Sequence, residues 1–322
     1  MTMRLGHGLL AALCLWLSVL SLSGAGSSAL VRVAVAHVRE NPSHAAEMGT
    51  QVLMGTPLKV APTDNASWMK VETPDGYRGY VASNSLCLTD SARMLRWRHS
   101  PRVVVSSTDQ TWLWTRDICD GDSLSEELQR VSDVVNGCIL ELDPSAEACE
   151  GYIAVKLPDG RRAMADEDDV EPLEQLAARP CSFDGAIDFA RSMMGSTYLW
   201  GGTSSKGVDC SGLTKVAFLS QGIILPRNAS QQARVGEPLP LADRMAFRPG
   251  DLLFFGNAAT GRVNHVGIAL GNGRFIHSSG RVRISSLIPG QAGYEDISLL
   301  GARRLLPAHL SRMALLNHPW YF

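Results

Sequence analysis

An internal repeat constrains the first half of the chain more than any other feature. A stretch of 19 residues occurs at 68–86 (WMKVETPDGYRGYVASNSL) and again, 84 positions later, at 152–170 (YIAVKLPDGRRAMADEDDV), without a gap. Both copies alternate apolar and polar residues around a Pro-Asp-Gly turn, a pattern that predicts a β-hairpin. Chance similarity is the alternative, but the shared turn, register and order favour two related β-domains. At about 30–90 and 95–175, each is too short for anything but a small barrel.

The first 29 residues have the pattern of a secretory signal peptide. Arg4 precedes a mainly apolar run at 9–22, and small residues follow at 23–29. A transmembrane anchor is the alternative, but about 14 residues fall short of the roughly 20 that a spanning helix needs. We therefore expect an exported protein, periplasmic or extracellular, that is cut after Ala25 or Ala29. Its mature form is not expected to span a membrane.

The net charge and the spacing of Cys and His residues limit which ligands are expected. The chain has a formal net charge of −2 and a pI near 6.4. Proteins that bind nucleic acid usually carry a basic excess, so no nucleic acid partner is expected. The sequence contains no CxxC or HxxxH spacing, and we therefore expect neither a metal site nor an organic cofactor.

Six of the seven cysteines follow the apolar N-terminal run. An exported protein can keep disulfides, and Cys119, Cys138 and Cys149 lie in one stretch of the chain. A bridge among these three is one interpretation, and buried free thiols are the other. Cys210 is expected to stay a free thiol for the reasons given below.

Helical patterns begin after residue 180. Four apolar residues recur at helical spacing over 183–195: Phe183, Ile187, Ala190 and Met194. Gly195 is expected to end this helix. A loop rich in Gly and Ser follows, and then a second predicted helix, ended by Gly222, with a buried face of Leu213, Val216 and Ala217.

Strand patterns come last. Strands are predicted at 251–255 (DLLFF) and 266–270 (VGIAL), and the second turns at 271–273 into RFIHSS. Helices followed by an antiparallel sheet define an α+β domain. We place this domain at 181–310.

Cys210 is the candidate nucleophile. A thiol attacks a carbonyl as the thiolate, so it needs an electropositive setting and a base. Cys210 stands where the Gly-rich loop becomes a helix, which brings helix N–H groups and the positive end of the helix dipole close to its sulfur. Asp209 can cap that helix, and the same turn can present N–H groups to an oxyanion. Taken alone, a cysteine at a helix start is more often a buried small residue.

Two histidines supply the missing partners. His265 precedes the 266–270 strand and His277 lies on the next one, so a tight hairpin brings them to about the same level of neighbouring strands. One imidazole can then take the thiol proton while the other fixes its tautomer and orientation. Two surface histidines in a hairpin are the alternative.

At six places, this half of the chain resembles the successive sequence blocks of the NlpC-type peptidases. The blocks are YLWGG at 198–202, DCSGL at 209–213, LPR at 225–227, RPGDL at 248–252, NHVGI at 264–268 and FIH at 275–277. The resemblance implies a papain-like domain that cleaves the bond between D-glutamate and a diamino acid in peptidoglycan peptides. It gives Cys210, His265 and His277 the roles of nucleophile, base and orienter.

The front half resembles the γ-D-glutamyl-L-diamino acid endopeptidases, also called dipeptidyl-peptidase VI. These carry two bacterial SH3-like modules before the NlpC-type domain, and the segment AEMGTQVLMG at 46–55 is similar to the first module. In that family the first module reads a free N-terminal L-Ala, which implies a released muropeptide as the substrate. The resemblance assigns Glu47 to the substrate ammonium and Tyr77 to the same pocket, with Tyr80 as second choice. The second copy of the repeat has Arg and Met at the two tyrosine positions, so neither tyrosine is needed to fold the module.

Four further residues match family positions that shape the substrate pocket: Tyr198, Trp200, Asp209 and Ser211. Asn228 and Ala229 are also expected to contact the substrate. The two aromatic residues are expected to cover the L-Ala and D-Glu backbone, with core packing as the alternative for Trp200. The family often has Asp where this chain has Asn228. A neutral amide still accepts a hydrogen bond, but the missing charge weakens the expected preference for a free amine.

The sequence therefore predicts an α+β cysteine peptidase, with a papain-like catalytic domain preceded by two small SH3-like β-barrels. It is expected to release L-Ala-γ-D-Glu from cell-wall peptides. Two other functions stay open. In one, the barrels anchor the enzyme to the wall, where it cuts intact sacculi. In the other, the Cys–His pair serves an amidase or acyltransferase of papain-like ancestry. The preferred diamino acid is not predicted.

Overall fold

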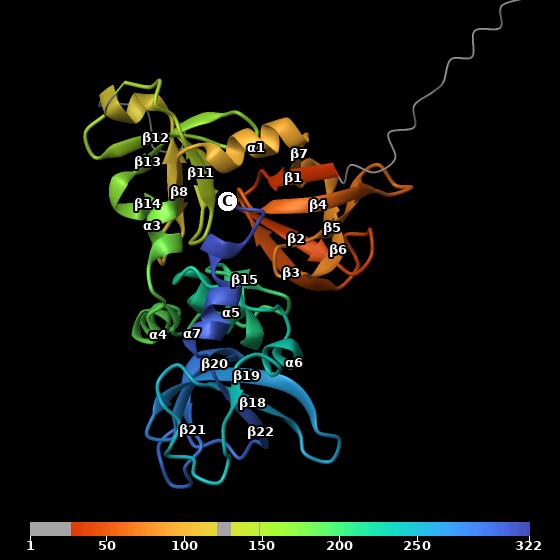
Figure 1. Cartoon of the computed structure of the whole chain (residues 1–322), viewed down its shortest axis with the longest axis vertical. Helices are drawn as coiled ribbons and strands as arrows, with labels where there is room; N and C mark the ends of the chain where they lie inside the picture. Colours follow the sequence, from red (N-terminus) through yellow and green to blue (C-terminus); the bar gives the residue numbers. More distant parts are fainter. Residues whose placement is uncertain (1–26, 121–129, 148) are drawn as a thin grey trace, which may run out of the picture.

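The computed structural model describes most of the chain: residues 27–120, 130–147 and 149–322. Two β-barrels lie above an α+β unit in the view of Figure 1, and the C-terminus lies between the barrels. Within the described ranges, no helix is long and apolar enough to cross a membrane.

The predicted signal peptide lies outside the described residues except for its last three. Those three begin strand β1 (Ser27–Val31), which pairs with two neighbouring strands of the first barrel. A cut after Ala25 would leave β1 whole, whereas a cut after Ala29 would remove more than half of it. Ala29 is fully buried in the barrel core.

The two barrels have the same strand order. The first consists of β1, β2 (Val35–Arg39), β3 (Met48–Leu53), β4 (Pro57–Pro62), β5 (Trp68–Glu72), β6 (Arg78–Ala82) and β7 (Leu86–Thr89), in the spatial order β3-β2-β6-β5-β4-β1-β7. After helix α1 (Ser91–His99), the second consists of β8 (Arg102–Val105), β9 (Thr111–Trp114), β10 (Arg130–Val134), β11 (Ile139–Leu142), β12 (Tyr152–Lys156), β13 (Arg162–Asp166) and β14 (Val170–Pro172), in the order β10-β9-β13-β12-β11-β8-β14.

The predicted repeat is confirmed down to single residues. Hairpin β5–β6 and hairpin β12–β13 begin and end at positions 84 residues apart. Their turns place Gly76 at φ 81° and Gly160 at φ 89°, in the left-handed region that favours glycine. The two turns differ in their contacts, since Asp75 binds Lys215 of the α+β unit and Asp159 binds Arg32 of the first barrel.

Helix α3 (Leu173–Ala178) follows β14 and packs against β8 and β14 of the second barrel. In the third unit, α4 (Phe183–Ser192), α5 (Cys210–Leu219) and α6 (Ala229–Gln232) precede the main sheet, as predicted, and α7 (Pro307–Met313) follows it. Its sheet runs β17 (Glu237–Pro238), β22 (Leu299–Arg304), β18 (Leu252–Asn257), β19 (Arg262–Gly271), β20 (Arg274–Ser279) and β21 (Arg281–Ser286), all antiparallel. A short hairpin of β15 (Thr203–Ser204) and β16 (Gly207–Val208) precedes α5.

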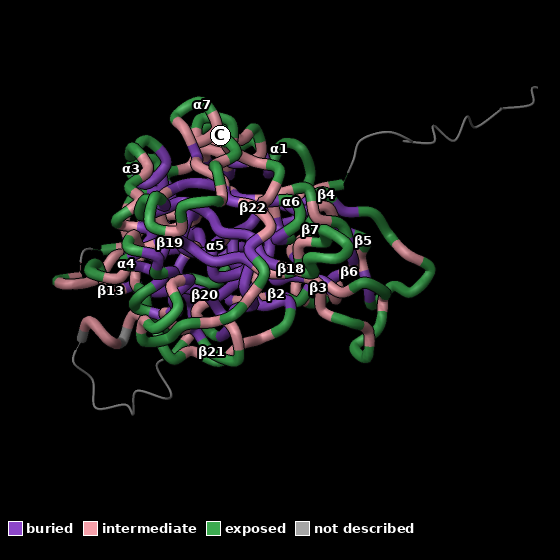
Figure 2. Tube along the Cα trace, turned by 90° about the horizontal axis from the view of Figure 1, so that it is seen from below, coloured by how far each residue is buried: buried purple, intermediate pink, exposed green. Residues whose placement is uncertain are grey.

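Both faces of this sheet are covered. Leu252 and Phe254 pack with helices α4 and α5, while Leu253 and Phe255 point into a second core on the opposite face. Figure 2 shows the buried segments running through the middle of the molecule. One predicted core residue is wrong: Met194 is 47% exposed, because α4 ends at Ser192 and the chain turns at Gly195.

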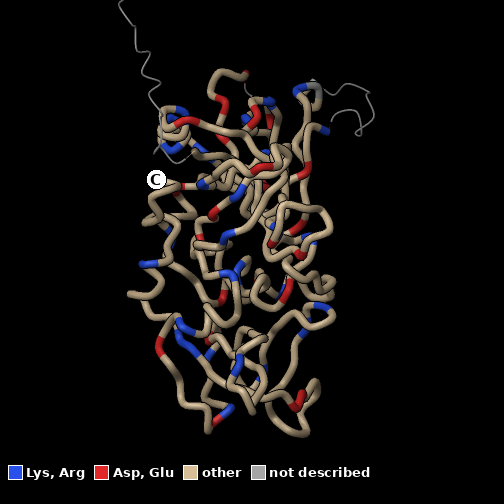
Figure 3. The backbone as a smooth tube through the Cα atoms, turned by 90° about the vertical axis from the view of Figure 1, so that its right-hand side faces the viewer, with Lys and Arg blue, Asp and Glu red and all other residues tan. Residues whose placement is uncertain are grey.

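The first barrel is joined to the α+β unit by buried polar contacts. The Gln51 side-chain oxygen accepts from the Thr203 N–H over 2.9 Å and from the Ser204 hydroxyl over 3.1 Å. The C-terminal segment adds a link to the second barrel, where Arg102 donates to the Tyr321 carbonyl over 2.8 Å. Acidic and basic residues alternate over the surface in Figure 3, so no single-sign face stands out in that view.

One of the predicted cysteine bridges is present. Cys119 and Cys149 form a disulfide across 30 residues of the second barrel. Cys138 is a buried free thiol, and its sulfur lies 3.4 Å from the Ala34 carbonyl of the first barrel. Of the three cysteines, two therefore form the predicted bridge, and the third is a buried free thiol.

Candidate active site

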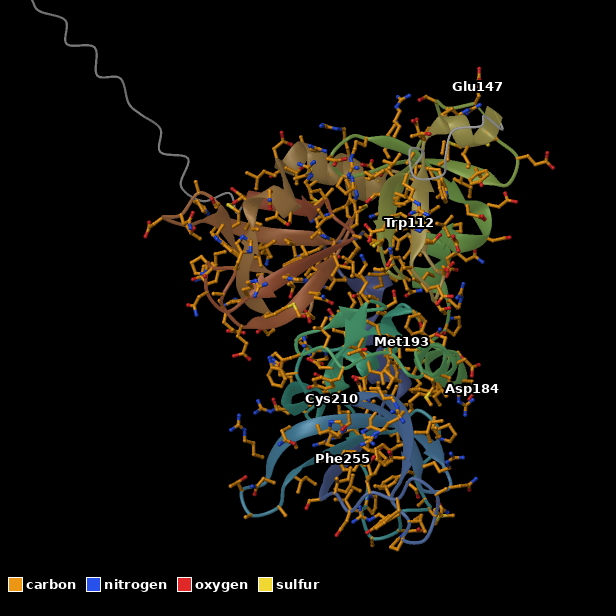
Figure 4. All side chains as sticks on the ribbon, turned by 180° about the vertical axis from the view of Figure 1, so that it is seen from behind. Trp112, Glu147, Asp184, Met193, Cys210 and Phe255 are labelled. Atoms are coloured by element: carbon orange, nitrogen blue, oxygen red, sulfur yellow. A yellow bond between two sulfur atoms is a disulfide. The ribbon has the colours of Figure 1, made fainter. Side chains whose placement is uncertain are left out.

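Cys210 is the first residue of α5 and lies on the side of the α+β unit that faces the first barrel (Figure 4). The preceding Asp209 caps the helix, as predicted, and accepts from the Gly212 N–H over 2.7 Å. The Cys210 sulfur lies 3.9 Å from the Asn264 carbonyl. The thiol is therefore held between the helix start and the backbone of β19.

Burial sets the resting state of this thiol. Cys210 is 7% exposed, and burial, followed by the nearby Asp209 carboxylate, raises the pKa of its thiol to about 11. The backbone N–H groups of Val266 and Ser211 and the charge of Arg227 act in the opposite direction on the same pKa. At neutral pH the thiol of the empty site is protonated, so it needs a base to attack.

The two histidines meet as predicted. His265 lies within β19 and His277 within β20, and His265 Nε2 is 2.7 Å from His277 Nδ1. A register shift between Ala269 and Gly271 makes them diagonal neighbours rather than directly opposed. Gly267 stands opposite His277, and a Cβ added there would lie 3.2 Å from the His277 Cβ. The same Cβ would lie 2.8 Å from the Phe275 ring, so a glycine at this position allows β19 and β20 to pack closely beside His277.

A hydrogen-bonded chain continues behind His277. Its Nε2 is 2.9 Å from the Ser285 hydroxyl, which donates to the Glu295 carboxylate. Arg283 binds the same carboxylate over 2.9 Å.

The direction of this chain fixes the tautomers. An ionised carboxylate only accepts, so the Ser285 hydroxyl donates to it and must accept from His277 Nε2. His277 Nδ1 is then an acceptor, and His265 Nε2 donates to it. The remaining nitrogen, Nδ1 of His265, carries a lone pair and can accept a proton.

Burial also keeps both rings neutral. Desolvation lowers the pKa of His265 to about 4, against the opposing charges of Glu295 and Asp209. Desolvation and the neighbouring His265 lower the pKa of His277 to about 4. Neutral imidazoles at physiological pH are the form that a general base requires.

A buried ion pair organises the residues around the thiol. Arg227 binds both carboxylate oxygens of Asp209 and donates to the Ser211 hydroxyl over 2.8 Å. Asp209 also accepts from the Gly201 N–H over 3.0 Å. Arg227 belongs to the LPR block at 225–227 but was not predicted as a site residue. Its position between an apolar run and a helix start was the signal that could have indicated this role.

One cavity of about 680 Å³ brings most of the predicted residues together. Its lining includes Glu47, Tyr77, Tyr198, Trp200, Asp209, Cys210, Ser211, Asn228 and Ala229. Tyr80, the second choice, is not part of this lining. His265 lines a neighbouring cavity, and Asn264 lines both. His277 is buried behind His265 at 1% exposure.

The first barrel forms an acidic wall of this cavity. Glu47 accepts from the Trp200 indole N–H over 2.8 Å, and Glu40 accepts from the Tyr77 hydroxyl. A Cβ on Gly49 would collide with that hydroxyl at 1.8 Å, so Gly49 makes room for it. Trp200 is 61% exposed, which excludes core packing. Glu40 was missed, and no sequence signal singled it out.

Asn228 and Ala229 of the α+β unit line the same cavity. Asn228 precedes the short helix α6 and is exposed, while Ala229 is its buried first residue. The Asn228 N–H donates to the Gln231 side-chain oxygen over 3.0 Å. Tyr198 also faces the cavity, and burial raises the pKa of its phenol to about 12, so the hydroxyl stays protonated.

Comparison with known families matches two segments of the chain. Residues 195–298 match the NlpC/P60 family, and residues 38–86 match the bacterial dipeptidyl-peptidase SH3 domain. The first match contains Cys210, His265 and His277, and the second contains Glu40, Glu47 and Tyr77.

Relatives and solved structures agree with these matches. The γ-D-glutamyl-L-lysine dipeptidyl-peptidase of Bacillus cereus is 35% identical over 48% of this chain and 46% of its own length. The dipeptidyl-peptidase 6 of Lysinibacillus sphaericus is 26% identical over 81% of this chain and 92% of its own length. The crystal structure of an NlpC/P60 family protein from Bacillus cereus superimposes with a TM-score of 0.71 at 25% identity, over 87% of this chain and 100% of that one.

Proposed function

We propose that this chain hydrolyses the bond between γ-D-glutamate and a diamino acid in peptidoglycan-derived peptides. The premise is that it carries an NlpC/P60 cysteine peptidase domain after a bacterial dipeptidyl-peptidase SH3 domain. The substrate begins with a free L-Ala, and L-Ala-γ-D-Glu is released. One observation carries the proposal: the cavity of the Cys210 thiol also contains the carboxylates of Glu40 and Glu47. Two carboxylates in a substrate cavity favour a ligand that ends in an ammonium group.

Acylation begins with a proton transfer. His265 Nδ1 takes the proton from the Cys210 thiol as the sulfur attacks the γ-carbonyl carbon of D-Glu. The S–C bond forms and the carbonyl oxygen becomes an oxyanion. The N–H groups at the start of α5 and the protonated Tyr198 hydroxyl are the donors available to stabilise it.

Collapse of the intermediate completes the cycle. The C–N bond breaks, and His265 gives its proton to the nitrogen of the diamino acid, which leaves. Water then attacks the thioester while His265 takes one of its protons, and that proton returns to the Cys210 sulfur as L-Ala-γ-D-Glu departs. The chain from His277 to Glu295 keeps His265 in the required tautomer throughout.

The acidic wall favours released peptides over the intact wall. In an intact stem the L-Ala nitrogen is part of a neutral amide, which cannot form a charge-assisted pair with Glu40 or Glu47. The apolar, signal-like N-terminus supports an exported enzyme, and the free-amine requirement supports a role in recycling cell-wall peptides.

The test compares a free and a blocked substrate. The full chain is incubated with L-Ala-γ-D-Glu-L-Lys and with its N-acetyl-L-Ala twin, and products are followed by mass spectrometry with Cys210→Ala as the blank. We expect L-Ala-γ-D-Glu from the free peptide alone. Glu40→Gln and Glu47→Gln should each reduce the preference for the free peptide over the acetylated one, mainly by raising KM for the free peptide.

The other outcomes separate the competing functions. Equal cleavage of both peptides, together with solubilisation of intact sacculi, would favour a wall-anchored hydrolase. Hydrolysis of simple esters without cleavage of either peptide would favour an amidase or acyltransferase.

A further inference from the structure

A second cavity lies beside the thiol cavity, on the side of His265. It measures about 490 Å³, and its polar lining residues are Asn257, Asn264, His265, Ser279, Glu295, Asp296 and Ser298. Asn264 lines both cavities, so they adjoin at the segment of β19 that contacts the Cys210 sulfur. Cys210 thus lines one cavity and His265 lines the adjoining one.

Reaction chemistry distinguishes the two sides. The acyl half of the substrate ends at the carbon that Cys210 attacks, and its ammonium end belongs with Glu40 and Glu47 in the first cavity. The leaving nitrogen must take a proton from His265, so it lies within hydrogen-bond reach of that ring. The leaving group therefore extends into the cavity that His265 itself lines.

We infer that this second cavity binds the leaving L-diamino acid and that the Asp296 carboxylate pairs with its side-chain ammonium. The inference rests on the proposed function and specifies the half of the substrate that the first cavity does not hold. It makes Asp296 a residue that determines specificity and has no part in the bond changes.

The charges of the second cavity support an ammonium ligand. Among the described residues that line it there are two carboxylates, and neither Lys nor Arg belongs to the lining. Glu295 is already engaged by Arg283 and by the Ser285 hydroxyl. Asp296 is the exposed neighbour of Glu295 and so can meet a ligand that enters from solvent.

The test varies only the leaving side chain. Three substrates share L-Ala-γ-D-Glu and end in L-Lys, Nε-acetyl-L-Lys or L-norleucine. The unchanged enzyme should prefer L-Lys about tenfold in kcat/KM at low salt, with the preference shrinking as salt rises. Asp296→Asn should bring the three substrates within about twofold of one another by slowing the L-Lys peptide alone.

Asp184→Asn is the matched control, because Figure 4 places Asp184 at the edge of the unit away from Cys210. This variant should keep the preference for L-Lys. An unchanged preference in Asp296→Asn, or the absence of any preference in the unchanged enzyme, would overturn the inference while leaving the proposed function intact. Failure of the unchanged enzyme to cut all three peptides would instead overturn the proposed function, and the inference with it.

Discussion

Trp200 of the α+β unit donates its indole N–H to the Glu47 carboxylate of the first barrel over 2.8 Å. The two residues lie 153 positions apart in the sequence. Glu47 is exposed on the loop before β3, so without this donor its side chain would have several rotamers open to it. The bond therefore fixes a carboxylate of the Cys210 cavity in place through a residue of the α+β unit.

Trp200→Phe should weaken substrate binding more than catalysis. The substitution keeps an aromatic wall but removes the N–H that holds Glu47, and we expect KM for the free tripeptide to rise about fivefold with kcat within twofold, a loss of about 1 kcal/mol. Steady-state kinetics measures both constants. Trp112→Phe in the second barrel, far from Cys210 in Figure 4, is the control and should change neither. A fall in kcat alone would argue against the positioning role of this bond.

The charged residues behind His277, Glu295 and Arg283, should shift the pH dependence of kcat/KM in opposite directions when each is neutralised. The Glu295 charge raises the pKa of His265 and the Arg283 charge lowers it, while Asp209 on α5 adds a smaller upward effect. Because His265 must be unprotonated to act as a base, activity falls at low pH as this ring gains a proton. Glu295→Gln lowers the imidazole pKa further and should move the acid limb of kcat/KM to lower pH. Arg283→Gln should move it to higher pH.

Glu295→Gln should also cost activity on the pH plateau. An amide can donate as well as accept, so the direction of the hydrogen bonds from His265 to Ser285 is no longer fixed. We expect a loss on the order of tenfold in kcat, or about 1.4 kcal/mol. A plain loss of folding would lower the active fraction without moving the acid limb, and titration of active sites with a thiol reagent separates the two.

Much of the site could be predicted because its parts are local. The capped helix start at Asp209 and Cys210 and the hairpin that carries the two histidines are short-range patterns. The exact level of the histidines could not be predicted. The register shift between Ala269 and Gly271 offsets one strand against the other, so that Gly267 and not His265 stands opposite His277 and the two rings meet diagonally.

The residues that were missed carry no sequence signal that links them to the cysteine or the histidines. Glu40 lines the Cys210 cavity and accepts from the hydroxyl of Tyr77, 37 residues further along the chain. Glu295 lies in the loop after β21, and its contact with Ser285 depends on how that loop folds back. The second cavity needs β18, β19, β20 and the 295–298 loop together, so it could not be predicted from the sequence.

Asp75, in the β5–β6 turn of the first barrel, forms an ion pair with Lys215 of the α+β unit that should contribute strongly to stability. Burial opposes ionisation of Asp75, yet Lys215 and Thr73 hold the pKa of its carboxyl below the ordinary value. Lys215→Met leaves that charge buried and unpaired, and should cost about 3–5 kcal/mol of unfolding free energy at neutral pH. The equivalent Asp159–Arg32 pair of the repeat has an arginine side chain that is 41% exposed, so Arg32→Met should cost at most about 1 kcal/mol.

The pH dependence of this pair has a defined sign. A carboxyl with a depressed folded pKa contributes stability above its unfolded pKa, and that contribution is lost as pH falls through the folded value. Urea unfolding at several pH values should therefore show the gap between the unchanged protein and Lys215→Met closing in acid. A gap that stays constant down to pH 3 would mean that packing of the Lys215 stem, and not its charge, supplies the stability.

The disulfide should matter for the second barrel and not for the chemistry. Closing a loop of 30 residues restricts the unfolded chain and contributes about 3 kcal/mol. The double variant Cys119→Ser, Cys149→Ser should therefore unfold at lower urea while kcat/KM of the folded enzyme stays unchanged. In Figure 4 Glu147, near this bridge, lies at the outer end of the second barrel, well away from Cys210. Cys87→Ser, which removes a half-exposed free thiol, is the control. A parallel loss of activity below the unfolding transition would instead show that the second barrel supports the site through the shared core of Leu30, Ile139 and Tyr321.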